Sequence, residues 1–146
     1  MNIRLAAEGD AAMLMHLNRA FNEVDEVPEQ TVMNRLSNGG EIVAVAQEEG
    51  QLIGFCCAQV HHSFCYASPS AEITEMFVEQ GARRKGVGRA LLAFMTAHLK
   101  DVHGVQEIHL LTGCENKAAK ALYAAMGFEE KNETYMRKKL ERNMGT

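Results

Sequence analysis

The chain has 146 residues, of which 47% are hydrophobic and 23% are charged, and its net charge is −4. This length and balance predict one globular domain spanning residues 1–146, with enough apolar side chains to bury a core. The acidic balance excludes a general nucleic-acid-binding surface, and the lack of any apolar run of about 20 residues excludes a membrane-spanning helix.

The N-terminal stretch has no signal-peptide core, so we expect a cytoplasmic protein without membrane partners. Four cysteines at positions 56, 57, 65 and 114 lack CxxC or His-paired spacing, which predicts reduced thiols and no metal site. Side chains alternate along a strand, so Cys56 and Cys57 should point to opposite faces. Cys114 lies just before Asn116, and we expect a structural thiol there too.

Hydrophobic periodicity and turn signals predict the elements of the first half of the chain. Asp10 is a candidate N-cap for the first helix, and Pro28 suits the first turn of the second, which Gly39 and Gly40 end. The expected elements are a strand at 2–5, a helix at 10–21, an acidic connection at 22–27, a helix at 28–38, and strands at 41–47 and 51–61 joined by a hairpin turn.

The second half predicts further strands and two helices. They are a strand at 71–79, a long helix at 86–102, a strand at 105–111, a short helix at 116–126, a final pair of strands at 128–131 and 133–140, and a frayed tail at 141–146. This order indicates an α/β fold with one mixed sheet of about seven strands and about four helices on both faces. The N-terminal strands should pair antiparallel, whereas the fourth and fifth strands, joined by a right-handed crossover, should be parallel.

The stretch from Ala71 to Leu92 runs from a strand, through a basic loop, into a helix N-terminus. First-turn N–H groups lack intrahelical partners and the helix dipole makes that end positive, so such a turn can hold phosphate. Glycines at 86 and 88 allow close approach of the backbone. A P-loop is excluded because Val87 stands where its Lys should be, and a dinucleotide fingerprint lacks its third Gly. The pattern predicts a polyphosphate-bearing ligand.

Two motifs point to a family. Arg83-x-x-Gly86-x-Gly88 resembles the acyl-CoA pyrophosphate motif Q/R-x-x-G-x-G/A of the GNAT superfamily of N-acetyltransferases. The stretch from Asn116 through Tyr123 to Gly127-Phe128 resembles that family's second signature. The resemblance covers about residues 71–128. It implies a GNAT-like sheet in which the parallel fourth and fifth strands, at 71–79 and 105–111, splay apart, with acetyl-CoA as cosubstrate and without a metal.

The resemblance also assigns roles to residues. Main-chain groups of Met76 and Val78, with Phe77 between them, would bind the pantetheine arm like an added strand, and Asn116 would bond it from the other side. A main-chain N–H of Phe77 or Val78 could polarise the thioester carbonyl. Tyr123 would contact the cofactor and protonate the departing thiolate. The pyrophosphate would lie on Arg83, Arg84, Lys85, Gly86, Val87, Gly88 and Arg89.

The general base is left open between several groups. Period-2 alternation puts Glu75 on the same strand face as Ile73 and Phe77, where apolar neighbours should raise its pKa, so Glu75 is the first choice, directly or through water. Glu72, on the opposite face, is the alternate. His61 and His62 are further candidates, and an exposed or salt-bridged carboxylate is an equally ordinary role for either Glu.

The acceptor is a primary amine of a small molecule or peptide. The acidic residues Glu23, Asp25, Glu26 and Glu29 border the expected acceptor site and suit a polyamine, an aminoglycoside or a lysine-containing peptide, although a solvated acidic loop is also consistent. A non-catalytic acyl-CoA-binding sensor and a nucleotide-binding module stay open as alternatives. Formation of a homodimer and the use of acyl groups larger than acetyl also stay open.

Overall fold

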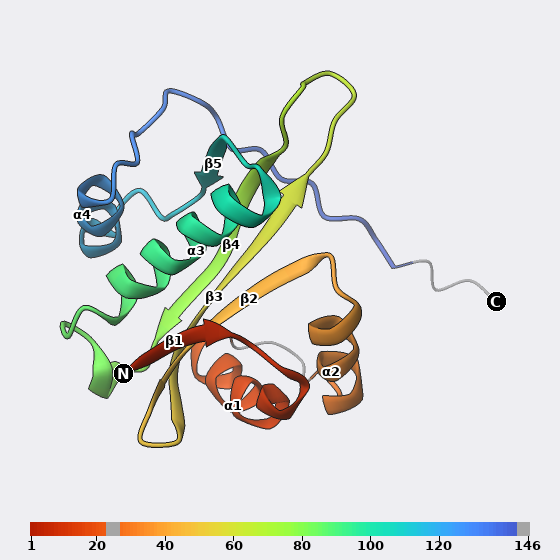
Figure 1. Ribbon diagram of the computed structural model, residues 1–146. Coiled ribbons are helices and arrows are strands. Elements are labelled where there is room, and N and C mark those ends of the chain that lie inside the picture. Colours follow the sequence, from red (N-terminus) through yellow and green to blue (C-terminus); the bar gives the residue numbers. More distant parts are fainter. Residues whose placement is uncertain (23–26, 143–146) are drawn as a thin grey trace.

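The computed structural model describes residues 1–22 and 27–142 (Figure 1). Its strands form one sheet in the order β1-β2-β3-β4-β5. The elements are β1 (Asn2–Leu5), the 3-10 helix η1 (Glu8–Asp10), α1 (Ala11–Phe21), α2 (Glu29–Asn38), β2 (Glu41–Glu48), β3 (Gln51–His61), β4 (Ser70–Val78), the 3-10 helix η2 (Gln80–Ala82), α3 (Val87–His103), β5 (Glu107–Leu110) and α4 (Lys117–Ala125).

The topology confirms the expected mixed sheet. Strands β1 to β4 pair antiparallel with their sequence neighbours, and β4 pairs parallel with β5 across the α3 crossover. The β2–β3 hairpin turns at Glu49 and Gly50, whose φ values of 51° and 77° fit a tight two-residue connection. Helices α1 and α2 lie on one face of the sheet and α3 lies on the other (Figure 1).

The expectation of seven strands is wrong, because residues 128–142 form no strand and run away from the sheet (Figure 1). The side chains of Tyr135 and Met136 in this segment do not join the core. They are instead 64% and 85% exposed. The frayed tail predicted at 141–146 lies mostly outside the described residues.

The core has two halves, one on each face of the sheet. The spacing of α3 predicts its inner face correctly: Val87, Leu91, Met95 and Leu99 are all buried against the sheet. The opposite half joins Leu14 and Leu17 of α1 to β2, β3 and β4. Cys56 and Cys57 are buried free thiols that belong to different halves, as the alternation predicts.

Asp10 occupies the N-cap position of α1, as predicted, but its side chain makes no capping hydrogen bond to the helix. Its carboxylate instead accepts hydrogen bonds from Arg4 Nη1 at 2.7 Å, Arg4 Nη2 at 2.9 Å and the Ala7 N–H at 2.7 Å. The fork of the guanidinium matches a carboxylate, so this nearly buried pair ties β1 to the start of α1. Hydrogen bonding from Arg4 holds the pKa of Asp10 below its ordinary value.

A β-bulge in β4 changes which side chains share a face. Cys57 pairs with Glu75 and the next residue of β3 pairs with Ile73, so Thr74 is an extra residue. Ile73 therefore belongs to the core half on the α3 face, whereas Phe77 belongs to the α1 face. Glu75 shares the face of Phe77, as predicted, but not that of Ile73, and Glu72 lies on the same face as Glu75.

Within the described residues, no helix is both long and apolar enough to cross a membrane.

Candidate active site

Strands β4 and β5 pair along only part of the length of β4. Their ladder ends at the pair Ile73–Leu110, where β5 stops while β4 continues to Val78. In the described structure the main chain of residues 74–78 therefore has no strand beside it on the β5 side. An opening beyond the carboxyl ends of parallel strands is where α/β sheets bind ligands, so this gap is a candidate site.

The turn that follows β4 leads into the N-terminus of α3. Gly86, at the N-cap of α3, has φ 79°, a left-handed conformation that favours glycine, and no side chain caps this helix in the described structure. A Cβ on Gly86 would meet no atom within 4 Å, so the space beside this turn is open. Arg84, Lys85 and Arg89 are exposed around it. These features fit a pyrophosphate on the uncapped N–H groups.

Arg83 is bound back onto the sheet. Its Nε donates a hydrogen bond to the Val78 carbonyl at 2.9 Å, and its guanidinium carbon lies 5.8 Å from the centre of the Phe77 ring. Arg83 thus positions the end of β4 rather than extending freely. The Val78 carbonyl oxygen has a second lone pair, which can still accept a hydrogen bond from a ligand.

A cavity of about 630 Å³, the α3–α4 cavity, connects the turn with the free edge of β4. It brings together all the predicted cofactor-binding residues except Lys85 and Tyr123. Those on its walls are Met76, Phe77, Val78, Arg83, Arg84, Gly86, Val87, Gly88, Arg89 and Asn116.

Two wall residues of the α3–α4 cavity also make contacts within the chain. Gly88 serves packing, because a Cβ there would lie 3.3 Å from Leu122 Cδ2 and 3.7 Å from Met76 Cε. Asn116 caps α4, its Oδ1 accepting the Ala119 N–H at 3.2 Å. That bond occupies the carbonyl oxygen of the Asn116 amide and fixes the side chain at the cavity wall.

Tyr123 lies in α4 beside the cavity wall formed by Ala119 and Leu122. Its ring packs against the α3 half of the core, 5.9 Å from the ring of Phe128. Burial, with a smaller contribution from Cys56, raises the pKa of Tyr123. The phenol therefore keeps its proton at neutral pH, as a general acid must.

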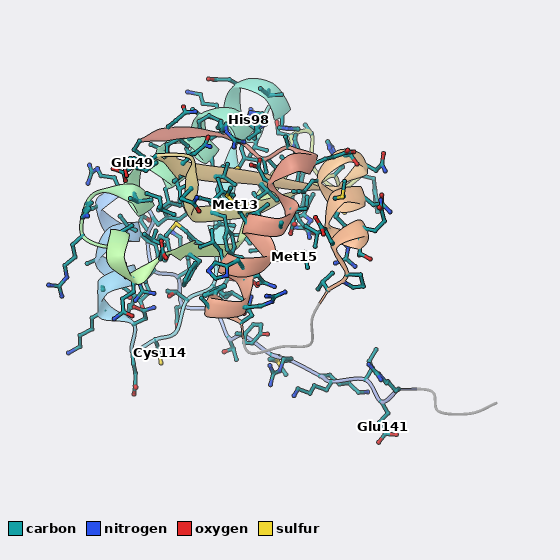
Figure 2. The ribbon with its side chains drawn as sticks, turned by 90° about the horizontal axis from the view of Figure 1, so that it is seen from below. Met13, Met15, Glu49, His98, Cys114 and Glu141 are labelled. Carbon is teal, nitrogen blue, oxygen red and sulfur yellow. The ribbon has the colours of Figure 1, made fainter. Side chains whose placement is uncertain are left out.

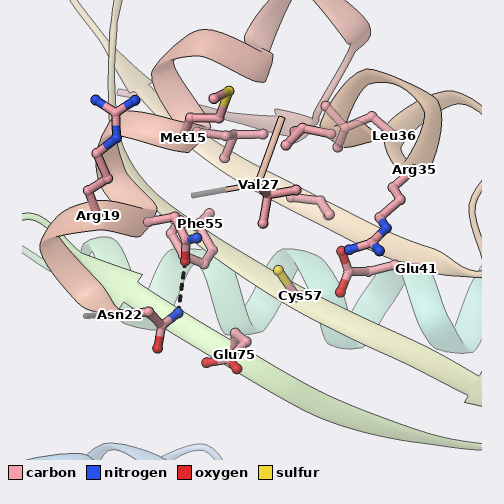
Figure 3. Close-up of a pocket in the computed structure, with 14 residues that line it drawn as sticks. Met15, Arg19, Asn22, Val27, Arg35, Leu36, Glu41, Phe55, Cys57 and Glu75 are labelled. Atoms are coloured by element: carbon pink, nitrogen blue, oxygen red, sulfur yellow. Dashed lines mark hydrogen bonds between the residues drawn. The ribbon is translucent and has the colours of Figure 1, made fainter. Parts of the chain in front are cut away.

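A second pocket, the α1–α2 pocket of about 240 Å³, lies on the opposite face of β4 (Figure 3). Helices α1 and α2 cover it, and strands β2, β3 and β4 form its floor. Figure 3 shows Arg35 pointing toward Glu41, with Cys57 and Glu75 on neighbouring strands. The rings of Phe55 and Phe77, 6.0 Å apart, pack together on the α1 face of the sheet.

Two carboxyl groups in the α1–α2 pocket have raised pKa values. Desolvation raises the pKa of Glu75, in the direction that alternation predicts. Burial also raises the pKa of Glu41; Arg35 opposes this shift and the charge of Glu75 adds to it. The sequence interpretation missed Glu41, although alternation along β2 puts it on the face of Val43 and Val45.

The remaining candidates lie elsewhere. Glu72 faces His61, with 3.6 Å between Oε2 and Nε2, and His62 is exposed. Cys114 is exposed on the loop before α4 (Figure 2). Burial raises the pKa of Cys56 to about 12 and also raises the pKa of Cys57, so both thiols stay neutral.

The acidic cluster predicted beside the acceptor site is described only in part. Glu23, Asp25 and Glu26 lie outside the described residues, and Glu29 is an exposed residue in the first turn of α2.

The fold and the site define an α/β protein with a mixed sheet that opens where β5 ends beside β4, next to the uncapped N-terminus of α3. The model of the Acetyltransferase (GNAT) family matches residues 11–128. The chain is 31% identical over 141 residues to the uncharacterized N-acetyltransferase YhfO of Bacillus subtilis, covering 89% of this chain and 91% of that one. The chain therefore belongs to the GNAT family of acetyltransferases and is an acyltransferase.

Two further similarities are to proteins named as aminoglycoside acetyltransferases. It is 28% identical to an aminoglycoside N(6')-acetyltransferase type 1 of Stenotrophomonas maltophilia over 144 residues, covering 95% of this chain and 94% of that one. Its fold matches the aminoglycoside N-acetyltransferase AAC(6')-Iy, solved in complex with CoA, with a TM-score of 0.78, 23% identity, and coverage of 95% and 100%. The GNAT family uses acetyl-CoA.

Proposed function

We propose that the protein transfers the acetyl group of acetyl-CoA to a primary amine by direct attack of the amine on the thioester. One observation carries this proposal: β4 separates the α3–α4 cavity, with its anion-binding turn, from a pocket that contains a carboxyl group of raised pKa. A donor on one side and an acceptor on the other would meet at residues 75–78.

The donor would lie with its pyrophosphate on the turn at 83–89 and its pantetheine arm along the free edge of β4. The main chain of Met76 and Val78 offers hydrogen bonds there, and Asn116 lines the other side. A main-chain N–H of Phe77 or Val78 would polarise the carbonyl. Acetyl-CoA itself supplies the acyl group as a thioester, and the chain positions it and moves protons.

Two side chains would move those protons. An amine nucleophile must lose a proton, and Glu75 would accept it directly or through one water, since its raised pKa brings it closer to that of the amine. The bond that forms joins the amine nitrogen to the acetyl carbon, and the bond that breaks is carbon–sulfur. Tyr123 would give its phenolic proton to the departing thiolate and regain one from solvent.

The acceptor would be a small cationic amine or an amine of a peptide. Glu41 and Glu75 place two carboxyl groups in the α1–α2 pocket, and such groups attract a substrate with several amines. The name of the Stenotrophomonas relative refers to aminoglycosides, which fit that description. The acceptor panel should contain an aminoglycoside, a polyamine and a lysine-containing peptide.

The test combines calorimetry with thiol release. Acetyl-CoA should bind with measurable heat, and free CoA thiol should appear only when an acceptor is added. Binding of acetyl-CoA without thiol release for any acceptor of the panel would contradict the proposal and indicate an acyl-CoA sensor. Competition by 3′,5′-ADP as strong as that by CoA would contradict a role for the pantetheine arm and favour a nucleotide-binding module.

A further inference from the structure

Three side chains from three adjacent strands converge on the face of the sheet that carries Glu75. They are His61 at the end of β3, Glu72 in β4 and His109 in β5. One ligand atom from each lies within 4.8 Å of the others. His61 Nε2 is 3.6 Å from Glu72 Oε2, and the two imidazole rings stack with centroids 6.0 Å apart.

The backbone holds this cluster in place. Glu72 is the direct partner of His109 in the parallel ladder, and His61 pairs with Ser70, so Glu72 has a histidine on each neighbouring strand. Strands in a sheet lie about 4.8 Å apart, which fixes the starting distances of the side chains. On β5, His109 lies between Ile108 and Leu110, which both pack against the core. His109 therefore points to the opposite, solvent side.

We propose that His61, Glu72 and His109 bind one divalent transition metal ion, with Zn²⁺ as the expected occupant. Two imidazoles and one carboxylate form a donor set that suits zinc, whereas Mg²⁺ and Ca²⁺ prefer oxygen ligands alone. Zinc bonds of about 2.0–2.2 Å put tetrahedral ligand atoms about 3.3 Å apart. The side chains of His61 and Glu72 are 46% and 31% exposed, so small rotations can close the remaining distance.

The position of this cluster predicts how a bound metal ion would affect the sheet. Glu72–His109 is the pair just before Ile73–Leu110, after which the β4–β5 ladder ends. A metal ion there would join β3, β4 and β5 at the closed end of the gap proposed for the thioester. It would fix the short strand β5 to the sheet and stabilise the folded chain by mass action. This inference does not depend on the proposed acetyl transfer.

The sequence predicted no metal, because these ligands share no local spacing. Each comes from a different strand, and only the sheet register brings them together. A spacing rule such as CxxC detects ligands on one turn and cannot detect ligands on three strands.

The test uses full-length protein without a polyhistidine tag, stripped with a chelator and titrated with Zn²⁺ in calorimetry. We expect one ion per chain with a Kd below about 100 µM, and a rise of Tm with added zinc. His109→Asn and Glu72→Gln should each weaken binding at least about tenfold and abolish the Tm rise. Circular dichroism and Tm of the metal-free variants show whether they fold.

Two matched histidine variants make the result specific. His62→Asn removes an exposed imidazole next to His61, and His98→Asn breaks the His98–His103 pair, whose rings are 5.2 Å apart on α3. Both should leave zinc binding and the Tm rise unchanged. Loss of binding in His98→Asn with retention in His109→Asn would place the ion on α3 and overturn the proposal. Binding weaker than about 100 µM in the wild type would overturn it too.

Discussion

Glu41 and Glu75 line one pocket, close enough that the charge of Glu75 helps to raise the pKa of Glu41. They come from β2 and β4, on the two sides of β3, and the bulge at Thr74 turns Glu75 to the face that Glu41 shares. The pocket thus offers two carboxyl groups with different surroundings. Desolvation raises the pKa of both, but Arg35 lies beside Glu41 and opposes its shift, whereas among the described residues no opposing charge acts on Glu75.

Glu75→Gln should lower kcat/KM by roughly 10²- to 10⁴-fold near neutral pH, because it removes the proposed general base. A base works when deprotonated, so the wild-type rate should rise with pH through a pKa above the ordinary carboxyl value. The loss should shrink at higher pH, where the amine deprotonates unaided. Thiol-release kinetics across pH measure both effects.

Glu72→Gln is the matched control for Glu75→Gln, since it changes a carboxylate of the same strand and face that is engaged with His61. In metal-free buffer this variant should keep nearly wild-type kinetics. A loss in Glu75→Gln that does not vary with pH would contradict the base role and indicate that Glu75 positions the acceptor.

Glu41→Gln should raise the KM for a polycationic acceptor by roughly threefold to thirtyfold while kcat changes little, because it removes one charged partner of the acceptor. The KM for acetyl-CoA should not change. Glu48→Gln, at the exposed end of β2, is the control and should alter neither constant. A fall in kcat with unchanged acceptor KM would contradict an acceptor-binding role for Glu41.

Tyr123→Phe should lower kcat by roughly tenfold to a thousandfold while leaving CoA affinity nearly intact, because only the phenolic proton is lost. The ring would still fill its place against the core and Phe128. Tyr135→Phe removes an exposed hydroxyl of the C-terminal segment and should have no effect. An unchanged kcat in Tyr123→Phe would remove this residue from the mechanism.

Local patterns predicted the parts of this fold that local forces decide. The apolar spacing of α3 identified its buried face, and the strand–loop–helix order identified the parallel β4–β5 pair. Period-2 alternation along the strand also placed Glu75 correctly on the face of Phe77. The error concerned Ile73, since period-2 alternation holds only for an unbroken strand and the extra residue Thr74 reverses it.

Features that depend on distant partners were not predictable from local patterns. The sequence predicted two strands in 128–140, but strand formation depends on pairing with a distant segment, and among the described residues this segment pairs with no strand although β5 is at the edge of the sheet. The pKa of Glu41 is raised mainly by burial and to a smaller extent by the charge of Glu75 on another strand. His109 meets His61 only through the order of strands in the sheet.

Gly86→Val should weaken acetyl-CoA binding by about tenfold or more, because φ 79° is strained for a β-branched residue and the uncapped N–H groups would be misplaced. The fold should survive, since a Cβ there meets no neighbour. Gly81→Ala, in the same connection but without a positive φ, is the control and should bind normally. Equal affinities for Gly86→Val and the wild type in calorimetry would contradict the anion-binding turn.

Asp10→Asn should destabilise the protein by about 1–3 kcal/mol at pH 7, because it removes the charge that Arg4 contacts through two hydrogen bonds. The folded pKa of Asp10 is lowered, so its contribution is complete above the unfolded value of about 3.9 and is lost as pH falls through the folded pKa. Urea unfolding of the wild type and variant should therefore converge between pH 5 and about pH 2. Glu8→Gln, at the neighbouring exposed carboxylate, should show no such difference, and a constant gap across this pH range would show that Asp10 acts through packing rather than charge.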